Sequence, residues 1–273
     1  MKAMRVFPDS VLGVGLMVAA LFVAFRDPRG AHVFAANAAR SPVVVELFTS
    51  EGCSSCPPAD LLLQKLVQEQ AIADAEIIAL EEHVDYWNHD GWVDPYSSSE
   101  WTERQQSYAA VFNNDPYTPE AVVNGSSQFV GNNRGEAEAE IKKAAGNLKT
   151  EVRITRASSD ANGAQRFHVS VEKLAGSSAG DVAEIWLAVT EDGLHSSVMR
   201  GENAGRVLQH VATLRTLRKI GIAQAHDVSV SFSGDALVKF SPNWNPENLR
   251  VAVFVQEAKS REILGAASIR IKG

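Results

Sequence analysis

The two cysteines of the chain lie close together, as Cys53-Ser-Ser-Cys56. A thiolate at the amino end of a helix accepts backbone N–H groups and feels the positive end of the helix dipole, which lowers its pKa. Such a thiolate attacks disulfides, and a neighbouring thiol can resolve the mixed disulfide that forms. We expect Cys53, at the turn, to attack and Cys56, closer to the helix, to resolve.

The same motif has two other interpretations. Two cysteines can supply half of a tetrahedral zinc site, although the chain has no second C-x-x-C pair. They can also form a structural disulfide, although so short a loop removes little entropy from the unfolded chain. The context favours redox chemistry, because a buried strand precedes the motif and a helix follows it.

The elements around the motif form a strand–helix–strand unit. Val43–Phe48 is short, apolar and β-branched, which indicates a buried strand. Pro57–Leu66 begins with two prolines, which the first turn of a helix tolerates, and Glu76–Leu80 predicts a second strand. A crossover through a helix makes these two strands parallel.

A second feature lies at Thr118-Pro119, immediately before the short strand Ala121–Val123 and the hairpin signal Asn124-Gly125. Proline lacks an N–H group and can take the cis form. A cis bond would turn the Thr118 backbone toward the cysteines, where it could pair with an extended substrate. The alternative is a proline that simply begins a strand.

An aromatic-rich loop after the second strand carries His83 and His89. The carboxyl ends of parallel strands share one edge, so this loop is expected beside the cysteines. A histidine there could lower a thiol pKa, or complete a copper or zinc site with Cys53 and Cys56. The third interpretation is that the polar groups brace a loop whose aromatic rings pack over the domain or line a groove for a peptide.

Two further groups of residues lie in the second half of the chain. His195, Met199 and His210 are ligand types that suit copper, but their spacing follows no known ligand rule. The polar segment 200–206 is interpreted as a turn with salt links, and a contact surface for the first domain is the alternative.

Beyond about residue 148 the pattern changes to short alternating strands separated by turn clusters, which is typical of an antiparallel sandwich. We therefore predict an α/β domain over residues 42–148 and an all-β, sandwich-like domain over residues 149–273. The expected strands lie near Glu151–Arg156, Phe167–Leu174, Val182–Val189, Val228–Phe232, Ala236–Phe240, Arg250–Gln256 and Ala267–Ile271.

Residues 1–38 have the features of an export segment. Lys2 and Arg5 precede an uncharged run, Val11–Phe25, which fits a signal-peptide core and is shorter than the roughly 20 residues of a membrane-spanning helix. Ala36 and Ala38 fit a cleavage site after Ala38. The alternative is an uncleaved anchor that tethers the protein to the membrane through residues 11–25. Both interpretations place the body of the protein outside the cytosol, in the periplasm or secreted.

Composition excludes several classes of protein. The chain has 273 residues, of which 45% are hydrophobic and 22% charged, an ordinary globular balance. Its formal net charge of −7 disfavours a nucleic-acid binder, which needs clustered Lys and Arg. No G-x-G-x-x-G or P-loop pattern occurs, so we expect no nucleotide cofactor.

The segment Glu46–Asp60, which contains the cysteines, resembles a family of exported bacterial proteins of unknown function, DUF1223. The segments His83–Asn88 and Arg200–Arg206 share this resemblance, which covers about residues 42–271. The strand, C-x-x-C, helix and Thr118-Pro119 arrangement also resembles the thioredoxin fold.

By resemblance to thioredoxins, Cys53 matches the nucleophile, Cys56 the resolving thiol and Pro119 the cis-proline. The sequence departs from that pattern at two places before the motif. Gly52 stands where an aromatic residue is usual, and Glu46 lies one position away from the buried acid that relays protons.

The expected fold is thus an α/β thioredoxin-like domain followed by an all-β sandwich-like domain. The expected function is that of an extracytoplasmic thiol–disulfide oxidoreductase with Cys53, Cys56, Thr118 and Pro119 at its site and no cofactor. Its partners would be client protein thiols or disulfides and a redox partner of unknown identity. The alternatives are a copper or zinc binding or delivery protein, and a redox-inert interaction protein of thioredoxin fold.

Overall fold

The computed structural model describes residues 40–89, 91–147, 149–160, 164–223 and 230–271. The predicted export segment or anchor, residues 1–38, lies outside these ranges. Within them, no helix is both long and apolar enough to cross a bilayer. The described residues belong to one compact unit.

The motif lies in a strand–helix–strand unit, as the sequence predicts. The unit consists of β1 (Ser41–Thr49), α1 (Pro57–Glu69) and β2 (Ala75–His83). β1 and β2 are parallel. The two prolines at the start of α1 fit a first turn, whose N–H groups lack partners within the helix. This places Cys56 at the amino-terminal cap of α1.

Helices cover both faces of β1, which explains why this strand is apolar at almost every position. The remaining elements of this part are α2 (Ser99–Phe112), β3 (Glu120–Val123), β4 (Ser127–Val130) and α3 (Arg134–Ala145). Val43, Val45 and Leu47 share one apolar cluster with side chains of α1 and α3. On the opposite face, Val44 packs in a cluster with Trp101, and Phe48 packs in one with Tyr108.

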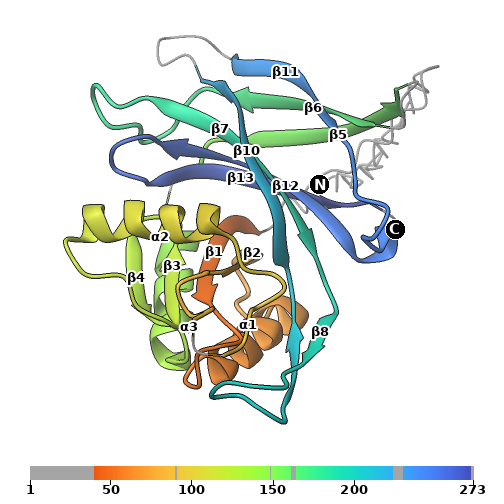
Figure 1. The fold of residues 1–273 in the computed structure, drawn as a ribbon. Helices are drawn as coiled ribbons and strands as arrows, with labels where there is room; N and C mark the ends of the chain where they lie inside the picture. The colour runs from red at the N-terminus through yellow and green to blue at the C-terminus, as the bar shows by residue number, and fades with distance from the viewer. Residues whose placement is uncertain (1–39, 90, 148, 161–163, 224–229, 272–273) are drawn as a thin grey trace, which may run out of the picture. The chain divides into compact units, whose positions relative to one another are not determined.

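The second half of the chain is almost entirely strands. They are β5 (Val152–Ser159), β6 (Gln165–Glu172), β7 (Ala183–Glu191), β8 (Leu194–Ser197), β9 (Val207–His210), β10 (Thr213–Ile222), β11 (Val230–Val238), β12 (Leu249–Glu257) and β13 (Ile263–Arg270), with a short 3-10 turn at Pro246–Asn248. Strands β11, β6 and β5 form one sheet (Figure 1). Its apolar side chains share a core with those of β7 and β12.

One eight-stranded sheet runs through both halves of the chain, in the order β13-β12-β7-β10-β2-β1-β3-β4. The boundary predicted near residue 148 falls between α3 and β5, and strands from both sides of it join this sheet. The two halves meet where β10 runs parallel to β2, with Thr213 opposite Glu81.

The sequence interpretation missed β8, β9 and β10. β10 includes Arg215, Arg218 and Lys219 among its apolar residues, so its pattern does not indicate a buried strand. The two strands expected at Val228–Phe232 and Ala236–Phe240 are, in the described residues, one strand, β11, which continues through Gly234 rather than turning there.

Candidate functional site

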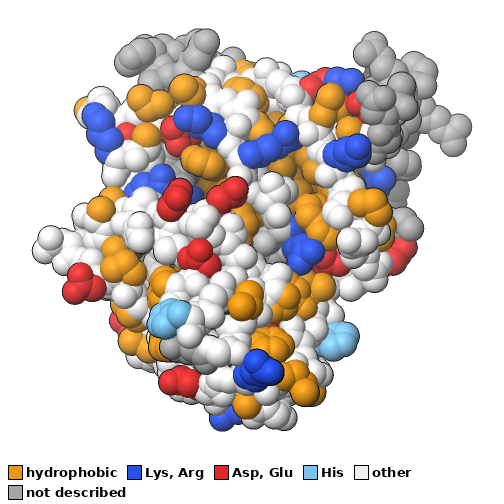
Figure 2. All heavy atoms as spheres, in the orientation of Figure 1, with side chains coloured by type: hydrophobic (Ala, Val, Ile, Leu, Met, Phe, Trp, Pro, Cys, Tyr) orange, Lys and Arg blue, Asp and Glu red, His pale blue; other side chains and the backbone are white. Residues whose placement is uncertain are grey.

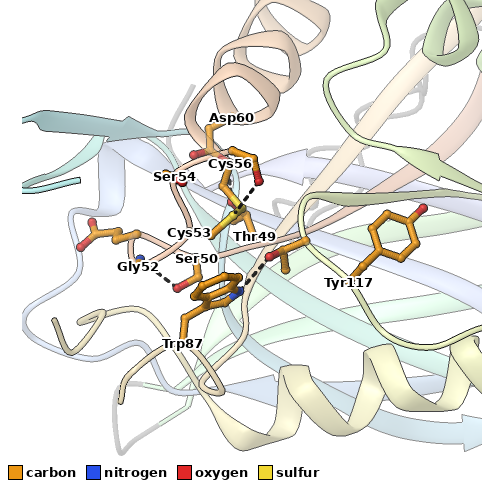
Figure 3. The surroundings of a disulfide bond; sticks show 12 residues. Thr49, Ser50, Gly52, Cys53, Ser54, Cys56, Asp60, Trp87 and Tyr117 are labelled. Carbon is orange, nitrogen blue, oxygen red and sulfur yellow. Dashed lines mark hydrogen bonds between the residues drawn. A yellow bond between two sulfur atoms is a disulfide. The ribbon is translucent and has the colours of Figure 1, made fainter. Parts of the chain in front are cut away.

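Cys53 and Cys56 form a disulfide between the carboxyl end of β1 and the start of α1 (Figure 3), with their Cα atoms 5.4 Å apart. Neither residue is exposed to solvent. Ser54 and Ser55 between them are exposed, and the Ser55 hydroxyl lies 3.3 Å from Cys53 Sγ. The disulfide is therefore buried, and the side chain of the exposed Ser55 contacts Cys53 Sγ.

Trp87 connects the motif to Thr118. Its indole Nε1 donates a hydrogen bond of 2.8 Å to Thr118 Oγ1 (Figure 3). Trp87 also lies directly against Gly52, because a Cβ atom placed on residue 52 would be 3.0 Å from the Trp87 Cβ atom. Absence of a side chain at position 52 thus lets the aromatic loop approach the cysteines.

Thr118 and Pro119 lie at the same edge as the cysteines. Phe48 pairs with Glu120, so the two residues before Glu120 lie beside the carboxyl end of β1, where the motif begins. The Thr118–Pro119 peptide bond is cis. All four predicted site residues are thus at one end of β1, and Trp87 bridges them.

The loop between β8 and β9 holds the motif from the other half of the chain. Asn203 is fully buried, and its Nδ2 donates hydrogen bonds of 2.9 Å to the backbone oxygens of Glu51 and Cys53. The backbone N–H of Ser54 donates a bond of 3.0 Å to Glu202. The segment 200–206 therefore contacts the first half of the chain, which was the alternative to a turn with salt links.

A buried carboxyl group lies close to Cys56, at Asp60 (Figure 3). Thr49 donates a hydrogen bond of 2.6 Å to it. Burial and the negative charge of Glu81 raise the pKa of Asp60 to about 7, so the group can exchange a proton near neutral pH. The sequence interpretation missed Asp60, although its spacing of one helical turn from Cys56 places both residues on one side of α1.

Glu46 has a different role from the proton relay that its position suggests. It accepts hydrogen bonds of 2.5 Å from Arg104 and from the Tyr108 hydroxyl. Burial alone would raise the pKa of Glu46, but the charge of Arg104 and these bonds lower it overall. Glu46 therefore stays ionised in a buried ion pair.

The histidines do not come together in the combinations that the sequence suggested. His83 is fully buried and its Nδ1 lies 2.7 Å from Asp94, whereas His89 is exposed. With the cysteines joined in a disulfide, no thiolate is available to complete a site with them. His195 and Met199 are exposed while His210 is buried, so these three do not form a common copper site.

The surface drawn in Figure 2 carries acidic, basic and apolar side chains interspersed with one another. On that face they do not gather into a basic stripe of the kind that contacts phosphate groups.

Comparisons with known proteins place the chain in a wider group. A family model described as "Protein of unknown function (DUF1223)" matches residues 44–256. The crystal structure of a protein from Agrobacterium tumefaciens is similar to this chain with a TM-score of 0.64 and 25% sequence identity, covering 84% of this chain and 94% of that one. HBP35 of Porphyromonas gingivalis is similar with a TM-score of 0.61 and 16% identity, covering 85% and 75%, and this likeness concerns the fold alone. No curated protein matches the chain.

Proposed function

Because the chain belongs to the DUF1223 family of proteins of unknown function, we propose from its own residues that it is a thiol–disulfide oxidoreductase with a thioredoxin-like first half. The observation that carries this proposal is the Cys53–Cys56 disulfide at the start of α1, with the carboxyl group of Asp60 buried close by. A C-x-x-C pair at a helix start is suited to forming a thiolate, and a nearby acid is suited to moving the second proton.

In the reduced protein, the Cys53 thiolate attacks one sulfur of a client disulfide. A bond between Cys53 and the client forms, the client disulfide breaks, and the departing client sulfur takes a proton from solvent. The Asp60 carboxylate then accepts the proton of Cys56, which attacks Cys53 Sγ and releases the second client thiolate. The client gains two electrons, and a dithiol redox partner must reduce the new disulfide again. The reverse sequence oxidises client thiols.

Two groups control access to the sulfurs. Ser55 lies 3.3 Å from Cys53 Sγ and its hydroxyl can donate to the thiolate. The Trp87 indole N–H donates a hydrogen bond to the Thr118 hydroxyl beside the motif. A client strand that pairs with the Thr118 backbone would lie next to this hydrogen bond, so Trp87 is placed to affect access to the cysteines.

The complete burial of both cysteines also favours a second candidate, a redox-inert disulfide that braces a protein–protein interaction module. In this case Trp87 and Asn203 would permanently cover the motif. The two candidates differ in one measurable property, the exchange of the disulfide with external thiols in the native protein.

We further propose that the protein acts outside the cytosol. The support is the signal-peptide pattern of residues 1–38 and the disulfide, since oxidising compartments preserve such bonds. Residues 11–25 would tether it to the membrane if the segment is retained.

The test is a redox titration of the native protein in dithiol buffers, with free thiols alkylated and counted by mass. We expect both cysteines to titrate together, Cys53→Ser to abolish insulin reduction and client oxidation, and Cys56→Ser to trap a mixed disulfide through Cys53. Ser54→Ala, a change at an exposed neighbour, is the matched control. A disulfide that stays closed to every reductant in the native protein, or full activity of Cys53→Ser, would overturn the proposal and favour the inert module.

A further inference from the structure

Five ionisable side chains, which we call the seam cluster, are buried where β2 and β10 meet. Each is at most 2% exposed. The members of the seam cluster are Glu51, Glu81, His83, Asp94 and His210. Such a density of buried charge is costly unless the groups are paired or bind a metal ion.

Three members of the seam cluster have the spacing of metal ligands. His83 Nε2 lies 3.5 Å from one oxygen of Glu81, and His210 Nδ1 lies 3.3 Å from the other. All three ligand atoms lie within 4.8 Å of one another. In a tetrahedral zinc site with bonds of about 2.1 Å, ligand atoms are about 3.4 Å apart, so only small movements would accommodate an ion.

The second nitrogen of each imidazole already contacts a carboxylate. His83 Nδ1 lies 2.7 Å from Asp94, and His210 Nε2 lies 3.1 Å from Glu51. Metal-binding histidines almost always have such an outer partner, which fixes the ring and directs the other nitrogen toward the ion. Asp94 and Glu51 are themselves held by hydrogen bonds, since the Glu51 N–H donates to Asp94 and Trp92 donates to Glu51.

An independent observation points to a ligand at this place. His83 Nε2 is fully buried, faces Glu81, and has no hydrogen-bond partner among the residues that the structure describes. A buried polar atom without a partner destabilises a fold by about 1–3 kcal/mol and needs an explanation. The contact with the Glu81 carboxylate at 3.5 Å is one explanation, and coordination of a cation between the two groups is the other.

We propose that Glu81, His83 and His210 bind one divalent transition-metal ion, Zn²⁺ being the ion that this donor set suits best. The site does not use the cysteines and goes beyond the proposed redox function. A pocket of about 380 Å³ between β8, β9 and Gln64 of α1 includes His210 in its lining and lies on the side of the site nearest the surface. The bound ion ties β2 of the eight-stranded sheet to β9 of the separate β8–β9 pair.

The first experiment uses the full-length oxidised protein, stripped with chelator and titrated calorimetrically with Zn²⁺. We expect one ion per chain, and a thermal midpoint that rises with Zn²⁺ and falls again on addition of EDTA. Co²⁺ should bind with a visible spectrum that lacks a thiolate charge-transfer band. No bound metal, or more than one equivalent of equal affinity, would overturn the assignment.

Variants then locate the ion. His83→Ala and His210→Ala should each weaken Zn²⁺ binding more than about 100-fold, and Asp94→Asn by about 10–100-fold. His195→Ala is the matched control, because this exposed histidine lines the same pocket, and it should bind as the wild type does. An unchanged Zn²⁺ affinity in both histidine variants would overturn the proposal. If neither variant folds, the Co²⁺ spectrum of the wild type decides between the outcomes.

A double variant separates this site from the redox proposal. Cys53→Ser with Cys56→Ser should lose thiol exchange and still bind one Zn²⁺. Loss of the metal in this variant would place the ion at the cysteines and overturn the assignment to Glu81, His83 and His210.

Discussion

The side-chain amide of Asn203 donates a hydrogen bond of 2.9 Å to the backbone oxygen of Cys53, across 150 positions of sequence. The same amide donates to the backbone oxygen of Glu51. One buried side chain from the β8–β9 loop therefore fixes the backbone of the motif from the half of the chain that carries no cysteine.

Asn203→Ala should lower the free energy of unfolding by about 1–2 kcal/mol, because two hydrogen bonds are lost, although the Cys53 backbone oxygen keeps the bond from the Cys56 N–H. Urea denaturation of the oxidised protein measures this. Glu202→Gln is the control: Glu202 is exposed, and we expect a change of less than about 0.5 kcal/mol. Equal effects of the two variants would contradict the role given to Asn203.

Trp87→Phe should speed reduction of the disulfide by a small phosphine several-fold, because the ring loses its hydrogen bond to Thr118 and the loop opens more often. Thr118→Val removes the same bond from the other side and should act in the same direction. The measurement is the rate of thiol appearance in native buffer. Trp244→Phe, at a partly buried residue in the turn before β12, serves as control. A wild-type rate in both test variants would show that this bond does not gate access.

Asp60→Asn should change the pH dependence of thiol exchange. In the wild type, the Asp60 carboxyl, with its pKa raised to about 7 by burial and by Glu81, becomes able to accept a proton as the pH rises through 7. The rate of insulin reduction should therefore rise as the pH passes through 7. The variant should still form its disulfide, but its rate should not show this rise near pH 7. A profile identical to that of the wild type would remove Asp60 from proton transfer.

The raised pKa of His210 predicts how the stability of the metal-free protein varies with pH. Burial opposes its charged form, but the negative charge of Glu81 and the hydrogen bond that the imidazolium donates to Glu51 raise its pKa to about 9. Because a histidine has an ordinary pKa near 6.5, this interaction stabilises the fold fully below about pH 6.5 and is lost as the pH rises through 9. The titratable groups that face it, Glu51, Glu81 and His83, are buried.

Urea denaturation of the chelator-treated, oxidised protein between pH 7 and 9 tests this expectation. The free energy of unfolding should fall over the interval, and His210→Gln should flatten the slope. His168→Gln, a change at an exposed histidine, should show the same slope as the wild type. A slope of opposite sign in the wild type would refute the assignment.

Local pattern was sufficient to predict the elements that hold the cysteines. β1, α1 and β2 follow from a short apolar run, two prolines and a second apolar run, and each lies within a few residues of its expected range. The four predicted site residues also lie together at one end of β1. Their chemical roles and the thioredoxin-like fold stay predictions.

The parts that the sequence did not predict depend on contacts between distant segments. β10 has a charged, irregular pattern, and its position follows from pairing with β7 and β2 rather than from its own composition. His210 meets Glu81 across 129 positions, so nothing in the neighbourhood of either residue reveals the seam cluster. Asp60 was overlooked for a different reason, since an acid in the first turn of a helix is ordinarily explained by the helix dipole.

The long separation between Cys53 and Asn203 also sets an order of events. A nascent chain grows from its amino end, so both thiols emerge well before the amide that secures their loop and before the strand that pairs with β2. Throughout that interval the thiols are reachable by small oxidants and by enzymes that introduce disulfides. A disulfide that forms in this interval forms before the Asn203 amide holds the motif in place.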